Sequence, residues 1–169
     1  MNDQQLWQHG LQLLRTLLND MPHDRKKQLS ELLCGYRGVK ESQAAIIMAI
    51  DSKTACSDCE GQCCMNGKYR MNVLDALSVI AAGKSLLPAF LQKPACPYGD
   101  ELGCKLEPGF RPADCILFVC DILDMRLSDD NRNDLNMHES ALKDCLQKAS
   151  RLLGMTLNTP LLLWAAKTQ

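Results

Sequence analysis

Eight of the ten cysteines fall into two groups on either side of a connecting segment, and the first group occupies only nine residues. The eight are Cys56, Cys59, Cys63, Cys64, Cys96, Cys104, Cys115 and Cys120. Thiolates are preferred ligands of zinc and of iron–sulfur clusters. The sequence therefore predicts a metal site divided between two loops, with all eight cysteines as candidate ligands.

The spacing within the first group favours convergence of its sulfurs. Cys56 and Cys59 are separated by two residues, so both side chains can face one centre, and Gly61 permits the turn that leads to Cys63. The neighbouring side chains of Cys63 and Cys64 are expected to diverge and to contact different partners. A single four-thiolate ion is then an incomplete account. Two four-thiolate centres, or one centre with spare thiols around it, both stay open.

The second group constrains the local helix structure. On an ideal helix, Cys115 and Cys120 would point about 140° apart, at about 100° per residue. They cannot both ligate one metal from the same undistorted helix. We therefore expect helix to begin near or after Cys115, or to be broken before Cys120. Arg111 is a candidate hydrogen-bond donor to a thiolate or to a loop carbonyl.

Helices must position these loops. Apolar residues recur at helical spacing in segments that are bounded by proline, glycine or a capping asparagine. The expected helices cover about residues 6–18, 23–36, 40–50, 73–82, 135–153 and 160–164. Gly10 lies on the apolar face of the first helix, where glycine costs about 1 kcal/mol relative to alanine, so we expect close approach of another helix there. Gly35 and Gly38 are predicted to separate the second helix from the third.

The fold class follows from these helices and from the lack of a strand pattern. Residues 94–113 contain four prolines and three glycines and are predicted to form a loop. We predict an all-α fold, a small helical domain with two irregular cysteine-bearing loops that form a metal site. One domain is expected over residues 1–169. Its cysteine region at about 55–121 is flanked by N-terminal helices at 2–50 and C-terminal helices at 130–167.

Composition argues against several classes of function. The net charge is −1, the pI is near 6.3 and aromatic residues make up 5% of the chain, so a nucleic-acid partner is not expected. No apolar run is long enough to span a bilayer, and the N-terminal residues lack the pattern of a secretory signal. We therefore expect a cytoplasmic protein, in which clustered thiols are kept reduced and act as ligands or redox groups.

The cysteine region resembles the cysteine-cluster proteins of YkgJ type, a family described as a zinc- or iron-chelating domain. Residues 56–64, Cys-Ser-Asp-Cys-Glu-Gly-Gln-Cys-Cys, fit the opening motif of the family, and Cys96-Pro97, Gly103-Cys104 and the run from Arg111 to Cys120 resemble its later motifs. The resemblance covers about residues 55–121. It departs at Ile116, where the family commonly has arginine, and at residues 105–108, where the family has Tyr-Glu. Metal binding through all eight cysteines is what the resemblance implies.

The remaining thiols and one histidine are placed outside this site. Cys145 and His138 lie on the inward stripe of the long C-terminal helix and are interpreted as core residues. Cys34 points away from the apolar face of its helix and is predicted to be a free thiol.

These patterns favour a metal-binding protein with a multi-cysteine site and leave open whether it is an enzyme. The first hypothesis is an iron–sulfur cluster protein that acts in electron transfer, in cluster handling or as an accessory factor. The alternative is a structural zinc-binding domain that serves as a protein-interaction module, and a protein partner is expected in that case. A third hypothesis is a thiol redox enzyme that uses Cys63 and Cys64. The predicted cofactor is an iron–sulfur cluster or zinc.

Overall fold

The structure is a computed structural model that describes residues 1–52, 54–55, 64–65, 67–90, 96–100 and 103–168. Helices dominate the described chain, which confirms the all-α prediction at this level. The α-helices are α1 (Asp3–Asp20), α2 (His23–Ala49), α4 (Val73–Ala81), α5 (Ala113–Leu117), α6 (Asp121–Asp124), α7 (Asp129–Leu153) and α8 (Leu161–Lys167). Two 3₁₀ turns, η2 (Gly67–Tyr69) and η3 (Pro108–Phe110), and two short strands, β1 (Gly99–Asp100) and β2 (Gly103–Cys104), complete the described elements.

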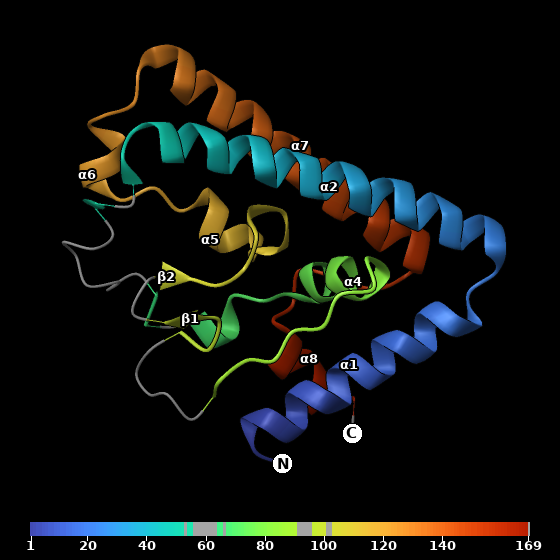
Figure 1. The fold of residues 1–169 in the computed structure, drawn as a ribbon. Coiled ribbons are helices and arrows are strands. Elements are labelled where there is room, and N and C mark those ends of the chain that lie inside the picture. The colour runs from blue at the N-terminus through green and yellow to red at the C-terminus, as the bar shows by residue number, and fades with distance from the viewer. Residues whose placement is uncertain (53, 56–63, 66, 91–95, 101–102, 169) are drawn as a thin grey trace.

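Two long helices, α2 and α7, lie side by side along the molecule (Figure 1). On the other side of α2, α1 packs against α8 and α4. The predicted close approach at Gly10 is confirmed, because a Cβ atom built there would lie 2.9 Å from the Cδ1 of Leu161 and 3.2 Å from the Cβ of Ala165. Within the described residues, no helix combines the length and the apolar character needed to cross a membrane.

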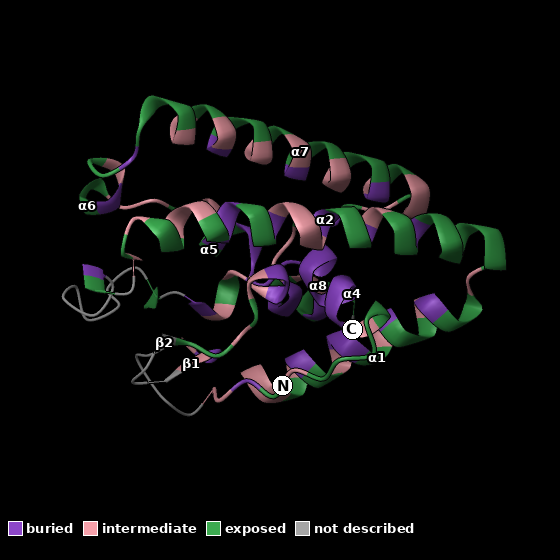
Figure 2. Cartoon of the chain, turned by 45° about the horizontal axis from the view of Figure 1, so that its top comes forward, coloured by how far each residue is buried: buried purple, intermediate pink, exposed green. Residues whose placement is uncertain are grey.

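The short helix α4 is the centre of the fold. Every residue from Val73 to Val79 is buried, and Figure 2 shows this helix enclosed while α7 keeps an exposed outer face. The predicted cap is present: the Asn72 side chain accepts from the Asp75 amide at 2.8 Å, and the Asp75 side chain accepts from the Asn72 amide at 3.4 Å. The most fully buried large side chains around α4 include Trp7, Leu14, Leu29, Leu33, Tyr36, Leu74, Leu77, Leu157 and Leu161.

The predicted break between two helices near residue 38 is wrong, because α2 continues from His23 to Ala49. Gly35 and Gly38 have no neighbouring atom within 4 Å of the position a Cβ would take, so both lie on the open side of the helix. Each glycine costs about 1 kcal/mol of helix propensity. The opposite side of α2 buries a continuous row of side chains, and this packing outweighs the local cost.

The stretch that was expected to be a loop contains small regular elements. Strands β1 and β2 pair antiparallel, with Gly99 opposite Cys104. Together with η3 and the start of α5, they correct the prediction for residues 94–113 in its described part. The elements are too short to leave a periodic pattern in the sequence. They lie, with α6, toward the C-terminal end of α2 (Figure 1).

Candidate metal centre

Five of the eight predicted ligands belong to the described residues, and each lies at or near the end of a short element. Cys64 precedes η2, Cys96 precedes β1, Cys104 is in β2, Cys115 is in α5 and Cys120 precedes α6. Cys96 and Cys120 are half-buried, and the other three are exposed. The remaining predicted ligands, Cys56, Cys59 and Cys63, lie outside the described residues.

The segment that follows Cys64 reaches the second cysteine group where η2 packs against Cys96. A Cβ atom built on Gly67 would lie 2.3 Å from the Sγ of Cys96 and 2.8 Å from its Cβ. Real Cβ atoms do not approach so closely, so only glycine fits there without movement. Gly67 is three residues after Cys64, the last cysteine of the first group. This close packing joins the end of the first group to the start of the second.

The hairpin then brings Cys104 back toward Cys96. The Gly99 amide donates to the Cys96 carbonyl at 3.1 Å, and Gly99 is paired with Cys104 across the two strands. The Lys105 amide donates to the Tyr98 carbonyl at 2.9 Å, which extends the pairing beyond β2. A β-pairing of this kind places residues on neighbouring strands about 5 Å apart.

The pKa of the Cys115 thiol is raised by its surroundings. Desolvation by the neighbouring protein atoms raises it most, although the residue as a whole is exposed, and the charge of Cys96 raises it next. Cys104 and Cys64 raise the same pKa by smaller amounts. The charges of Cys96, Cys104 and Cys64 therefore act in the same direction on the pKa of Cys115. Among the described residues, no three or more Cys, His, Asp or Glu side chains are arranged at metal-binding distances.

The predicted break between Cys115 and Cys120 is confirmed. Helix α5 ends at Leu117, residues 118–120 are extended, and α6 begins at Asp121. Because the helix is interrupted, the separation of about 140° between the two side chains that one continuous helix would impose does not apply. Cys115 and Cys120 therefore project from different elements.

A buried ion pair fixes the start of α5, and sequence reasoning missed it. Lys40 of α2 and Asp75 of α4 are both fully buried, with Nζ and Oδ1 3.0 Å apart. Lys40 Nζ also donates to the Arg111 carbonyl at 2.8 Å, and the Ala113 amide donates to the other Asp75 oxygen at 3.2 Å. The hydroxyl of Tyr36 donates to Asp75 Oδ1 at 3.0 Å. The segment that leads to Cys115 is thus held by the core itself.

Two arginines lie beside the cysteines with different roles. Arg111 donates from Nε to the Leu106 carbonyl at 3.0 Å. A loop carbonyl was one of the two acceptors expected for this side chain. Arg70, directly after η2, was not singled out from the sequence. Its positive charge lowers the pKa values of Cys115 and Asp114, and so opposes the desolvation that raises both. Arg70 therefore supplies positive potential next to the thiols.

Comparison of the chain with protein-family models, with curated proteins and with solved structures gives no significant match. None of these comparisons supports assigning the chain to the YkgJ-type proteins.

The inner wall of the cysteine region is aromatic. The Tyr98 side chain is 4% exposed, and its ring centroid lies 5.7 Å from that of Trp7, which also contacts Phe90 at 5.9 Å. Tyr98 follows Cys96 by two residues, so this wall is continuous with the second cysteine group. The hydroxyl of Tyr98 is buried without a hydrogen-bond partner among the described residues.

The residues that were placed outside the site have the environments predicted for them. Cys34 is exposed and free. Cys145 is half-buried against the core, and burial raises the pKa of its thiol. His138 is half-buried, with Nδ1 3.2 Å from the Oε1 of the buried Gln43. None of the three is among the groups whose charge shifts the pKa of Cys115.

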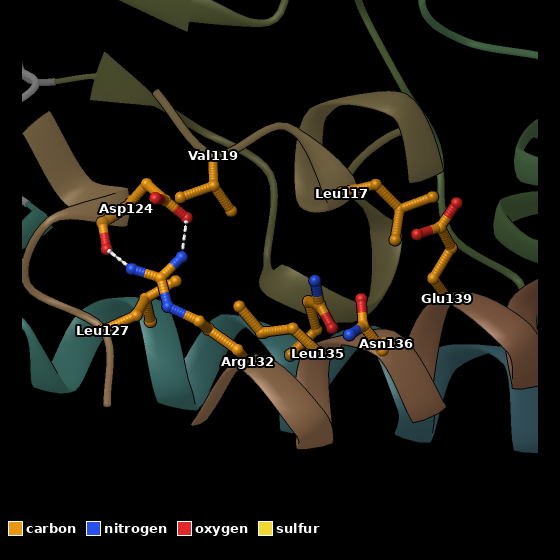
Figure 3. A pocket seen from close by; sticks show the side chains of 9 residues that line it. Leu117, Val119, Asp124, Leu127, Arg132, Leu135, Asn136 and Glu139 are labelled. Carbon is orange, nitrogen blue, oxygen red and sulfur yellow. Dashed lines mark hydrogen bonds and ion pairs between the residues drawn. The ribbon is translucent and has the colours of Figure 1, made fainter. Parts of the chain in front are cut away.

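A pocket of about 250 Å³ lies between α7 and the segment that runs from α5 to α6. Leu117 and Val119 line one side of it, while Arg132 of α7 donates to both the carboxylate and the carbonyl of Asp124 on α6 (Figure 3). This interaction attaches α6 to α7. Cys120 directly precedes α6, so α7 supports the last predicted ligand from outside the site.

Proposed function

We propose that this chain is a metal-binding protein whose clustered cysteines hold an iron–sulfur cluster, and that it acts in electron transfer, in cluster handling or as an accessory factor to another protein. The observation that carries the proposal is the packing of Gly67 against Cys96, which brings the segment after Cys64 next to the first cysteine of the second group. The β1–β2 pairing supports it from Cys104. The anchoring of α5 by Lys40 and Asp75 supports it from Cys115.

The donor set fits a metal of borderline or soft character. The predicted ligands are all sulfur, which suits zinc and iron–sulfur centres and does not suit magnesium or calcium. Four thiolates also bring a large negative charge, and Arg70 supplies positive charge on the same side. The vicinal Cys63 and Cys64 favour a cluster site over a single zinc ion, because two adjacent side chains do not readily face one ion. An iron–sulfur cluster would supply one-electron redox chemistry here.

The residues of the chain then have separate tasks around such a group. Cys64, Cys96, Cys104, Cys115 and Cys120 are the described residues that would hold it, together with predicted ligands outside the described chain. Tyr98 and Trp7 exclude water from the inner side. The buried Lys40–Asp75 pair keeps the start of α5 in place, so Cys115 is presented from a fixed backbone.

The proposal is tested by purifying the protein without oxygen, recording its visible spectrum and measuring iron, sulfide and zinc per chain. A brown protein with matched iron and sulfide supports it. A colourless protein with stoichiometric zinc overturns the cluster assignment, and protein that binds neither overturns metal binding. Cys96→Ser is expected to lower the metal content, while the matched variant Cys145→Ser leaves it unchanged. Equal loss in both variants would contradict the division between ligands and core.

A second candidate function, a structural zinc domain that binds a protein partner, is favoured by exposed apolar side chains beside the cysteines. Phe118, Ile122 and Met125 are 48%, 44% and 77% exposed, and they lie on or next to α5 and α6. In this case the metal only holds the two loops against the helices. Stoichiometric zinc that resists replacement by iron and sulfide would support this function in place of the first.

A further inference from the structure

An apolar patch is exposed on α6 and on the extended segment that precedes it. Its members are Phe118, Ile122 and Met125, all of which are exposed. Ile122 and Met125 are three residues apart in a helical segment, so they are neighbours on one side of it. Large apolar side chains that gather on a surface typically mark an interaction site. We call these three residues the α6 patch.

The α6 patch faces away from the pocket between α6 and α7. Leu117 and Val119 line that pocket (Figure 3), and successive side chains of an extended segment point to opposite sides, so Phe118 points outward. Asp124 also lines the pocket and is two residues, or about 200° around a helix, from Ile122. The patch is therefore directed to the solvent and not to α7.

The C-terminal end of α2 borders the patch. Arg126, the residue after Met125, donates from Nη1 to the carbonyls of Ile50 and Asp51, each at 3.2 Å. Met48, in the last turn of α2, is 63% exposed. Methionine side chains are flexible and adapt to partners of different shape. Met48 and Met125 therefore suit a surface that binds another protein.

The region around the patch is strongly acidic. Residues 112–139 contain seven acidic side chains and two arginines, although the whole chain has a net charge of only −1. Both arginines form ion pairs within the fold. Asp121 on α6 and Asp129 and Asp130 at the start of α7 are exposed, and none of the three forms an ion pair with another described residue. The surface beside the patch thus carries uncompensated negative charge.

This combination selects the class of partner. Negative charge repels nucleic acid and anionic lipid headgroups. The apolar side chains of the patch need an apolar surface to pack against, and the carboxylates need positive charge. A protein segment that combines apolar side chains with lysine or arginine meets both needs. A surface this small is typical of transient complexes.

We propose that the α6 patch and the carboxylates around it bind a basic, apolar segment of a partner protein. The inference rests on the protein-partner function proposed above, and it holds for either metal. Apolar side chains of the partner pack on Phe118, Ile122 and Met125, and its lysines or arginines lie beside the carboxylates. Electrostatic attraction speeds the encounter and makes binding sensitive to salt. Because Cys120 directly precedes α6, the partner lies next to the last predicted ligand.

The probe is a fluorescently labelled helical peptide with leucine on one face and lysine on the other. A peptide with glutamate in place of each lysine, and a scrambled lysine peptide of the same composition, are the matched probes. Fluorescence anisotropy should show that the chain binds the first peptide more tightly than the other two. The double variant Ile122→Ser with Met125→Ser should bind it about 10-fold more weakly, because apolar burial is lost. Leu87→Ser, at an 89% exposed position between α4 and β1, should match the wild type.

A second set of variants tests the charges. The triple variant Asp121→Asn, Asp129→Asn and Asp130→Asn should bind the lysine peptide about 10-fold more weakly at low salt. The difference should disappear near 1 M salt, where the Debye length is about 3 Å. The control has the same change of charge at exposed positions near the turn between α1 and α2, and it should bind as the wild type does: Asp20→Asn, Asp24→Asn and Glu31→Gln. Circular dichroism checks that each variant is folded.

Several results would overturn the inference. One is that the lysine peptide does not bind, or binds no better than the glutamate or the scrambled peptide. Another is an equal loss of binding in the patch variant and in Leu87→Ser, which would place the peptide elsewhere. Concentration-dependent dimers that the patch variant abolishes would show that a second copy of the chain covers the patch. The metal content of the wild type is measured separately: peptide binding by a chain that holds no metal overturns the metal-binding function alone, and metal binding without peptide binding overturns this inference alone.

Discussion

Replacement of Lys40 by methionine tests whether the core holds the second cysteine group. Lys40→Met keeps most of the side-chain volume but removes the charge that faces Asp75, and both residues are 0% exposed. Removing one partner of a buried ion pair typically costs about 3–5 kcal/mol, because the other charge stays buried without compensation. The Arg111 carbonyl also loses its donor. We therefore expect the free energy of unfolding to fall by about 3–5 kcal/mol.

Urea denaturation followed by circular dichroism measures this loss, and a thermal scan should show a melting temperature lower by roughly 6–20 °C for a chain of this size. The control is Lys143→Met, which breaks an exposed pair with Glu139 one helical turn away. Pairs of this kind contribute about 0.3–0.5 kcal/mol. A double variant, Lys40→Met with Asp75→Asn, should recover part of the loss, since no charge is then left buried.

The reasoning is refuted if Lys40→Met and Lys143→Met unfold at the same urea concentration. It is also refuted if the loss of stability in the double variant equals or exceeds the sum of the two single losses, because the two charges would then not stabilise each other. Metal affinity provides a separate readout. Since Lys40 holds the backbone before Cys115, Lys40→Met should weaken metal binding even at temperatures where the variant is fully folded.

Three further predictions concern glycines and thiols. Gly67→Ala should lower metal affinity, because the new Cβ would displace Cys96. Competition with a chelator measures this affinity, and an unchanged value would contradict a role of the Gly67–Cys96 contact in metal binding. Gly35→Ala should raise the free energy of unfolding by about 1 kcal/mol in urea denaturation, because the position is helical and open. Iodoacetamide at neutral pH should label Cys34 faster than Cys145, whose pKa is raised by burial so that less reactive thiolate is present. Peptide mass spectrometry should find that metal leaves the labelling rates of Cys34 and Cys145 unchanged. Protection of either cysteine by metal would place that cysteine in the site.

Local signals in the sequence predicted the ends of helices well. The Asn72 cap and the left-handed Gly154 that ends α7, directly after the expected helix over residues 135–153, are both present. Each of these depends on one residue and its nearest neighbours in the chain. The break at Gly35 and Gly38 failed for the opposite reason. Whether a helix passes through a weak helix former depends on what its other face buries, and that is decided by residues far away in the sequence.

The buried charge pair shows the same limit more sharply. Lys40 and Asp75 are 35 residues apart, and a lysine is rarely buried unless it is paired. One signal was available: Leu29, Leu33, Tyr36 and Lys40 recur at helical spacing, so Lys40 lies on the buried face of α2. The position of its partner cannot be found from periodicity. The convergence of the two cysteine groups stays a prediction from composition and spacing, while Gly67, which packs against Cys96, was not singled out from the sequence.

The anchoring of α5 would couple the proposed metal binding to the stability of the whole chain. The same short segment gives a carbonyl to Lys40, an amide to Asp75 and a thiol to the proposed site. A ligand that binds only the folded state stabilises it by about 4 kcal/mol when present at a thousand times its dissociation constant. Because that free energy acts on a segment that the buried pair already holds, metal should stabilise the helices around α4 as well as the loops. Protection of α4 amides from hydrogen exchange should therefore increase when metal is added, and an increase confined to the cysteine loops would show that the site and the core are independent.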